Sequence, residues 1–278
     1  MSSRRILLVT VLAMLAFAGN SLLCRLALKE TGIDAASFTG IRLVAGSGML
    51  CLLVAMRRGQ HDGRGNWLSS FALFTYAACF SYAYISLPAA SGALLLFGAV
   101  QATMIGYGIA HGERLLPSQS FGLILALGGL VGLVLPGLSA PPLVGSSLMI
   151  ASGAAWGVYS LRGKRAGDPL RVTAGNFLRA IPFAAVLTLL TIGEAAVEPA
   201  GFWYAVASGA LTSGIGYALW YMAVPTLSAS TAATVQLSVP VITALGGAIC
   251  LGEAVTLRLA LASLAILGGI ALVIVRRR

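Results

Sequence analysis

The chain has few charged side chains for its length. Of its 278 residues, 9% are Asp, Glu, Lys or Arg, whereas 58% are hydrophobic. A soluble domain carries roughly 25% charged residues, so water cannot be the main solvent of this protein. The composition excludes an ordinary soluble globular domain.

Acidic residues and histidines are especially scarce. The chain has eight Asp and Glu and two His, and all of them fall between apolar stretches or at their ends. An intramembrane aspartyl protease needs two Asp within the membrane, and a serine protease needs a nucleophile paired with a histidine there. We therefore do not predict an enzyme, and we assign no catalytic residue.

Clustered cysteines are also absent. Cys24, Cys51, Cys79 and Cys250 lie in or beside apolar stretches without CxxC spacing, so neither a metal site nor a cofactor is expected. The net charge of +10 is compatible with nucleic-acid binding, but the basic residues form short clusters between apolar segments. They are more typical of membrane topology signals, and no nucleic-acid partner is predicted.

What the chain does have is a series of long apolar stretches. Each has about 18 to 24 residues, which at 1.5 Å per residue is enough to cross a hydrocarbon core about 30 Å thick. A transmembrane barrel would alternate apolar and polar residues, whereas the stretch 260–275 is apolar on every face. The predicted fold class is an all-α membrane protein with ten transmembrane helices. We expect them over residues 5–28, 35–56, 66–87, 89–111, 117–136, 143–161, 171–192, 200–223, 227–251 and 256–275.

The distribution of basic residues predicts the orientation. Basic residues accumulate in cytoplasmic loops, and a cytoplasmic N-terminus places most of them on that side, including Arg57-Arg58 and the arginine cluster at 276–278. An even number of spans returns the C-terminus to the cytoplasm. We expect a multi-pass protein of the bacterial inner membrane with both termini inside.

An internal repeat divides the single membrane domain into two halves, residues 1–138 and residues 139–278. At a constant offset of 140, two dipeptides recur in one register, namely Gly112-Glu113 as Gly252-Glu253 and Gly128-Gly129 as Gly268-Gly269. Each half holds five helices, an odd number, so the second must insert upside down. Inverted repeats let many transporters alternate access, with substrate bound between the halves near the midplane. Duplication that merely built a stable bundle is the alternative.

The repeated motifs resemble a known family. Helix four begins with small residues at 89–94, and its counterpart in the second half, helix nine, has small residues at 230–234. In each half, a Gly-Glu and then a Gly-Gly dipeptide follow. The pattern resembles the drug/metabolite transporter superfamily, the EamA-type ten-helix exporters within it, and the YddG-type exporters of aromatic and other neutral amino acids. The resemblance implies export of amino acids or related small metabolites. A lipid or drug-like amphiphile flippase of the same fold, or a channel, remains open.

Proton relays across membranes usually run through intramembrane carboxylates or histidines. Because none is deep in a helix, we expect facilitated diffusion rather than carboxylate-based proton antiport. The expected partners are a small-molecule substrate and the lipid bilayer, and the protein is expected to act as a monomer.

A neutral or zwitterionic substrate calls for aromatic faces and a few neutral polar groups. We expect these groups near helix middles, where a polar side chain such as Asn20 or Gln101 would be costly against lipid. The predicted substrate-binding residues are Asn20, Tyr82, Phe97, Gln101, Trp156, Tyr159, Tyr217 and Gln236.

Five further residues are predicted to have structural or gating roles. Arg42 and Arg179 lie at matched depths in the two halves, which favours a structural role; binding of a substrate carboxylate is the alternative. Glu113 and Glu253 are expected to cap the helices that follow them. Pro240 should kink helix nine and can serve as a hinge.

Overall fold

The computed structural model describes residues 3–57, 63–112, 115–136, 140–163, 168–227 and 235–275. Every regular element in these ranges is helical, which confirms the all-α prediction. The long helices of the first half are α1 (Ser3–Glu30), α2 (Ala35–Met56), α3 (Trp67–Ser86), α4 (Ala89–Ala110) and α5 (Pro117–Val134). The α-helices of the second half are α6 (Leu143–Gly163), α7 (Pro169–Leu190), α8 (Pro199–Ala207), α9 (Gly216–Ala223), α11 (Ser238–Leu251) and α12 (Leu257–Val275).

Short elements complete the second half. The 3₁₀ turns η1 (Ile192–Glu194) and η3 (Val224–Thr226) lie outside the long helices, and the π-helical segment η2 (Ser208–Ile215) joins α8 to α9. The helix expected over 200–223 is therefore α8, η2 and α9 in succession. Part of the helix expected over 227–251 lies outside the described residues.

Helix starts follow local sequence signals. The side chains of Asp34, Asn66 and Asp168 each accept a hydrogen bond from a backbone N–H in the first turn of the following helix, which satisfies a donor that the helix cannot pair internally. Pro117 and Pro169 occupy the first position of α5 and α7, where the missing N–H costs nothing. The boundaries therefore lie close to the expected ones.

Pro240 lies in the first turn of α11. The helical run is interrupted at Leu237, three residues earlier, because a proline nitrogen cannot donate to the carbonyl four residues before it. Residues 228–234 of the expected helix lie outside the described residues, so the kink at Pro240 stays a prediction. Its use as a hinge stays a prediction.

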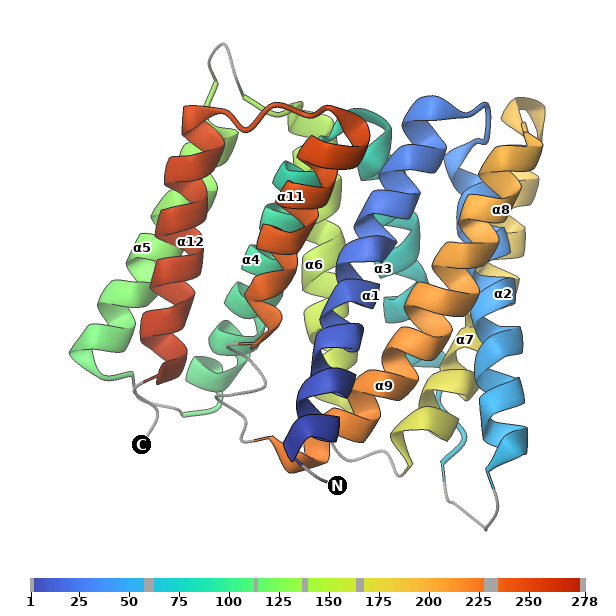
Figure 1. Ribbon diagram of the computed structural model, residues 1–278, viewed down its shortest axis with the longest axis horizontal. Helices are drawn as coiled ribbons and strands as arrows, with labels where there is room; N and C mark the ends of the chain where they lie inside the picture. The colour runs from blue at the N-terminus through green and yellow to red at the C-terminus, as the bar shows by residue number, and fades with distance from the viewer. Residues whose placement is uncertain are drawn as a thin grey trace.

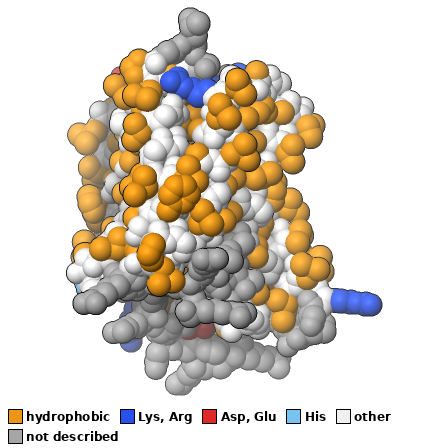
Figure 2. Space-filling model, turned by 90° about the vertical axis from the view of Figure 1, so that its left-hand side faces the viewer, with side chains coloured by type: hydrophobic (Ala, Val, Ile, Leu, Met, Phe, Trp, Pro, Cys, Tyr) orange, Lys and Arg blue, Asp and Glu red, His pale blue; other side chains and the backbone are white. Residues whose placement is uncertain are grey.

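The helices stand side by side and run up and down the bundle, so that both chain ends lie at its lower end in Figure 1. Six of the described helices, α1, α2, α4, α5, α7 and α12, are long and apolar enough to cross a membrane. On the face built by α5 and α12, hydrophobic side chains cover much of the described surface (Figure 2); Ile124 and Leu264 are examples, 69% and 72% exposed. Apolar surface of this extent is typical of contact with lipid.

The helices of the two halves interleave. α5 packs on α12, α4 on α11, and α2 on α7, so that each pair joins one helix from each half. α1 packs on α9 and α11, and α6 packs on α3 and α4. The buried core is therefore shared by both halves of the chain.

Glycine lets α5 and α12 approach closely. A Cβ at Gly269 would collide with the carbonyl oxygen of Gly122 and lie 2.7 Å from the nitrogen of Ala126. A Cβ at Gly122 would in turn lie 2.5 Å from the carbonyl oxygen of Gly269. A Cβ at the neighbouring Gly268 would have nothing within 4 Å among the described residues. Only one glycine of this repeated pair is therefore required for packing.

We predict that Gly269→Ala lowers the free energy of unfolding by about 1–3 kcal/mol, because the new methyl group overpacks the helix crossing. Gly268→Ala is the matched control on the same helix and should be neutral or slightly stabilising. Thermal unfolding of the purified protein in detergent measures both, and equal midpoints for the two variants would contradict the packing.

Candidate functional site

A buried arginine lies inside the bundle. Arg42 of α2 is 1% exposed, and its Nη2 donates a hydrogen bond of 2.9 Å to the hydroxyl of Tyr76 on α3. The guanidinium carbon lies 5.2 Å from the ring centroid of Tyr76 and 5.0 Å from that of Phe80. Both distances are within the range of cation–π attraction. Nε and Nη1 have no hydrogen-bond partner among the described residues.

Asn20 of α1 extends this polar centre. Its Nδ2 donates to the Tyr76 hydroxyl at 3.3 Å, so that hydroxyl accepts from both Asn20 and Arg42. Its Oδ1 accepts from Ser208 at 2.8 Å and from Thr212 at 3.4 Å. The amide thus joins α1 to α3 and to η2.

The segment that carries Ser208 and Thr212 is π-helical. A π-helical stretch inside a transmembrane-length helix is uncommon, and such stretches often occur at functional sites. Gly209 within it faces α2 so closely that a Cβ would collide with the carbonyl oxygen of Arg42. On the other side of the contact, a Cβ at Gly46 would lie 2.7 Å from the ring of Phe177. The backbone that carries Arg42 is therefore held tightly against η2 and α7.

Aromatic rings cover the side of the centre formed by the second half. Trp156 of α6 lies 4.8 Å from Tyr76, measured between ring centroids. It stacks on Tyr217 of α9 at 5.3 Å and 22°, and on Tyr159 at 5.3 Å and 28°. Trp156 therefore connects the arginine centre to a tyrosine cluster.

Neutral polar groups of α7 bind the hydroxyls of Tyr159 and Tyr221. The Tyr159 hydroxyl donates to Thr173 and accepts from Asn176, both at 3.4 Å. The hydroxyls of Thr173 and Tyr221 lie 3.0 Å apart. The hydroxyls of Tyr159 and Tyr221 thus find neutral partners, without a carboxylate.

The structure brings together four of the eight predicted substrate-binding residues, Asn20, Trp156, Tyr159 and Tyr217. Phe97 and Gln101 are buried on α4, but no described hydrogen bond or ring contact joins them to this group. Tyr82 is half-exposed and faces Asp34 and Thr191 near the helix ends. Gln236 is half-buried at the edge of the described chain. Their binding roles stay predictions.

Arg179 differs from Arg42 although the two occupy matched positions. Its Nη1 donates to the backbone carbonyl oxygens of Arg64 and, at 3.0 Å, Gly175. It therefore holds the segment before α3 against α7. A structural role for Arg179 stays a prediction.

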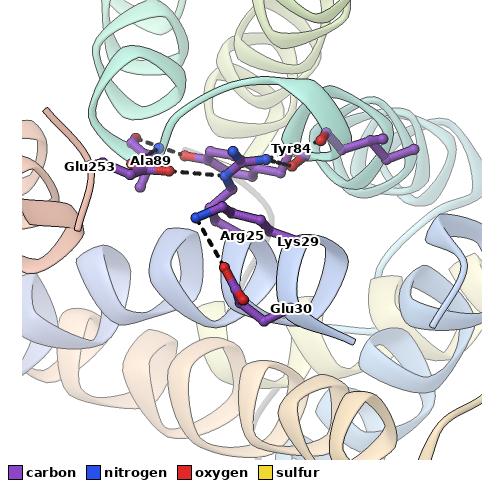
Figure 3. Close-up of polar contacts among 7 residues, drawn as sticks. Arg25, Lys29, Glu30, Tyr84, Ala89 and Glu253 are labelled. Atoms are coloured by element: carbon purple, nitrogen blue, oxygen red, sulfur yellow. Dashed lines mark hydrogen bonds and ion pairs between the residues drawn. The ribbon is translucent and has the colours of Figure 1, made fainter. Parts of the chain in front are cut away.

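Glu253 forms a contact between the halves, with Arg25 and Ala89 (Figure 3). It lies in the segment between α11 and α12, at the upper end of the bundle in Figure 1. Its Oε1 lies 3.0 Å from Nε of Arg25, and its Oε2 accepts from the backbone N–H of Ala89 at 2.7 Å. Nη1 of Arg25 also donates to the carbonyl oxygens of Tyr84 and Ile85.

Glu253 thus caps α4, whereas the sequence predicted that it would cap the helix that follows it. That expectation was wrong because α11 packs on α4, which brings the carboxylate to the free N–H groups of a neighbouring helix. Glu113 lies outside the described residues.

Asp34 forms a second contact between the two halves at the same end of the bundle. Its Oδ2 accepts from the backbone N–H of Ala196 at 2.9 Å, and its Oδ1 accepts from Ser37. Partial burial by itself raises the pKa of Asp34, but these hydrogen bonds outweigh it and hold the pKa below its ordinary value. At the opposite end, Arg57 and Asp168 form an ion pair of 3.1 Å between α2 and α7.

Comparison with known proteins identifies the family. The model of the EamA-like transporter family matches residues 4–135 and again residues 143–275. The chain belongs to the EamA-like transporter family. An uncharacterized protein of Pseudomonas aeruginosa is 58% identical over the whole chain and 97% of its own length. An uncharacterized transporter of Archaeoglobus fulgidus is 25% identical over 88% of the chain and 89% of its own.

More distant similarities concern part of the chain or the fold alone. A threonine/homoserine exporter of Salmonella typhimurium is 34% identical over 148 residues, half of this chain and 49% of its own length. A solved crystal structure matches this EamA-like transporter over the full length of both chains with a TM-score of 0.67 and 22% identity. At that identity the match supports the fold alone.

The sequence reasoning favoured Tyr82 over Tyr76, although Tyr76 is the residue that links Arg42 and Asn20 in this EamA-like transporter. Tyr76 and Phe80 are four residues apart and so share one helix face, whereas Tyr82 points elsewhere. A signal was available: a buried arginine needs hydrogen-bond and aromatic partners, and only one face of α3 could supply both. Ser208 and Asn176 were missed because η2 and the α7 contacts depend on packing.

We predict that Tyr76→Phe destabilises this EamA-like transporter by about 1–3 kcal/mol, because it leaves donors of both Arg42 and Asn20 without their acceptor. Tyr107→Phe is the matched control, since Tyr107 is 49% exposed, and it should change stability by at most about 0.5 kcal/mol. Detergent unfolding curves compare the two. Equal stability would mean that the Tyr76 hydroxyl is not holding the two side chains.

A separate prediction concerns the ion pair at the end of the bundle. Glu253→Ala should lower the free energy of unfolding by about 2 kcal/mol or more, because it removes the carboxylate that pairs with the largely buried Arg25 and leaves Nε of Arg25 and the Ala89 N–H without an acceptor. Glu30→Ala removes the exposed pair with Lys29 and should cost at most about 1 kcal/mol. The same unfolding assay measures both variants; a Glu253→Ala midpoint no lower than that of Glu30→Ala contradicts the prediction.

Proposed function

We propose that this EamA-like transporter exports amino acids or related small metabolites from the bacterial cytoplasm by alternating access. The observation that carries the proposal is the composition of the buried centre. Asn20 and Tyr76 come from the first half, Trp156 and Tyr217 come from the second, and they meet without an acidic side chain among the described residues. Aromatic faces with a few neutral polar groups suit a small zwitterion.

We propose further that the two halves are inverted repeats of five transmembrane helices each. Support comes from helix contacts that correspond when each helix is exchanged for its counterpart in the other half. The contact of α1 with α9 then corresponds to that of α6 with α3, and the contact of α1 with α11 to that of α6 with α4. The two matches of the family model, one in each half, support the same division. Such a pair can exchange conformations and open the centre to either side.

The relatives and the polar contacts suggest a substrate class and a mechanism. A relative that matches half of the chain is named a threonine/homoserine exporter, and the resemblance to YddG-type exporters implies aromatic or other neutral amino acids. The contacts at the two ends, Arg25 with Glu253 and Arg57 with Asp168, are placed to open and close with the halves. We propose facilitated diffusion by a monomer with both termini in the cytoplasm.

Counterflow in proteoliposomes tests the proposal. Purified protein is reconstituted with unlabelled amino acid inside, and uptake of a labelled panel that includes threonine, homoserine and tryptophan is measured. We expect saturable uptake above empty liposomes, without a requirement for a pH gradient. Uptake of no amino acid would contradict the proposed substrate class, and competition by lipid headgroups instead would favour a flippase.

Within this assay, Trp156→Ala should reduce counterflow at low substrate concentration by about fivefold or more, because it removes the ring that joins the two halves of the centre. Trp203→Ala is the control, since Trp203 is 66% exposed and lies outside the centre. Equal activity of the two variants would place the substrate elsewhere.

A further inference from the structure

Arg42 has more hydrogen-bonding capacity than the protein uses. A guanidinium has five N–H donors, and the only described partner of Arg42 is the Tyr76 hydroxyl, which takes one of them from Nη2. Nε and Nη1 are buried without a partner among the described residues. Buried donors of a charged group are normally paired, because leaving them unpaired is costly.

No acidic side chain of the described chain balances this charge. Of the eight Asp and Glu residues, Asp62 and Glu113 lie outside the described residues. The remaining six cap helices or lie at helix ends and in the segments between helices: Glu30, Asp34, Asp168, Glu194, Glu198 and Glu253. The ion pairs described within the chain involve Arg25, Lys29 and Arg57, and Arg42 is in none of them.

The surroundings position the guanidinium and leave part of it available. Tyr76 and Phe80 hold it by ring contacts, and the tight contact of α2 with Gly209 fixes the backbone beneath it. Nη2 carries two hydrogens and donates one of them to Tyr76. Its second hydrogen can be donated together with that of Nε or one of Nη1, which gives a pair of parallel donors. Such a fork matches the two oxygens of a carboxylate.

Arg179 shows what a structural arginine does in this fold. At the matched position of the second half, its guanidinium donates to two backbone carbonyl oxygens. Arg42 makes no described bond to a carbonyl. The two halves therefore treat equivalent arginines differently, which favours a ligand rather than the fold as the partner of Arg42.

We propose that Arg42 binds the carboxylate of the transported molecule, so that the substrate is a small monocarboxylate. The proposal rests on the proposed function and narrows its substrate class. The carboxylate accepts hydrogen bonds from the free fork of Arg42, and the remainder of the molecule lies against the rings of Trp156 and Tyr217. Tyr76 is a positioning residue, since it orients the guanidinium through its hydroxyl.

Ligand-induced thermal stabilisation of the purified protein tests the proposal without requiring transport. The probes are matched pairs of a carboxylate and its amide: threonine and threonine amide, tryptophan and tryptophan amide, lactate and lactamide, propionate and propionamide. Ionic strength is held constant with sodium chloride. For at least one pair, we expect the carboxylate to bind about tenfold or more tightly than its amide, since the charged acceptor is lost in the amide.

Variants then locate the effect. Arg42→Gln should reduce the preference for the carboxylate to about twofold or less, and Arg42→Lys should retain part of it, because a point charge replaces a fork. Arg179→Gln, the matched control, should keep the wild-type preference. If Arg42→Gln binds the amide with the same affinity as the wild type, the variant is folded. If it fails to fold, Arg42→Lys provides the comparison.

The outcomes separate the two proposals. Carboxylate preference that depends on Arg42, combined with no amino-acid counterflow, would support the carboxylate site and overturn amino-acid export. If amino acids show counterflow but carboxylates and amides bind equally, the carboxylate site is overturned, whereas amino-acid export is still supported. No preference in any pair, an equal preference in Arg42→Gln, or equal stabilisation by sulfate would each overturn the proposal.

Discussion

The buried guanidinium of Arg42 is the constraint on which the centre of the bundle depends. A charge in a largely apolar interior is costly, and here it is held by one hydroxyl and two aromatic rings. The same hydroxyl accepts from Asn20, which in turn accepts from Ser208 and Thr212 of η2. Tyr76 of α3 thus links Arg42 of α2 to Asn20 of α1. Through Asn20, it is also linked to the π-helical segment η2.

Small residues make this arrangement possible. Gly209 lets η2 approach the Arg42 backbone, Gly46 accommodates the ring of Phe177, and Gly122 with Gly269 brings α5 against α12. Between apolar helices in lipid there is little hydrophobic drive for association, so close packing and hydrogen bonds must supply the stability. At the bundle ends the described residues add polar contacts, such as that of Arg25 with Glu253.

Sequence reasoning predicted the all-helical fold and most helix boundaries because the length of an apolar stretch is a local signal, whereas the inverted arrangement of the two halves stays a proposal. It placed Asn20, Trp156 and Tyr217 in one site since an intramembrane polar or aromatic residue near a helix middle is informative by itself. It chose Tyr82 over Tyr76 because the face of a uniformly apolar helix cannot be told from its own sequence. The partner of Glu253 and the π-helical η2 depend on which helices become neighbours, and that is fixed only by the packing of the whole bundle.

The proposed substrate site lies where the halves meet, beside Trp156. The chain has four tryptophans, so Trp67, Trp203 and Trp220 can be replaced by Phe to leave Trp156 as the sole reporter. Its fluorescence is then followed in proteoliposomes as an amino acid that supports counterflow is added. A saturable change over the concentration range in which transport saturates is the predicted result, and a signal unchanged across that range would contradict binding at this site.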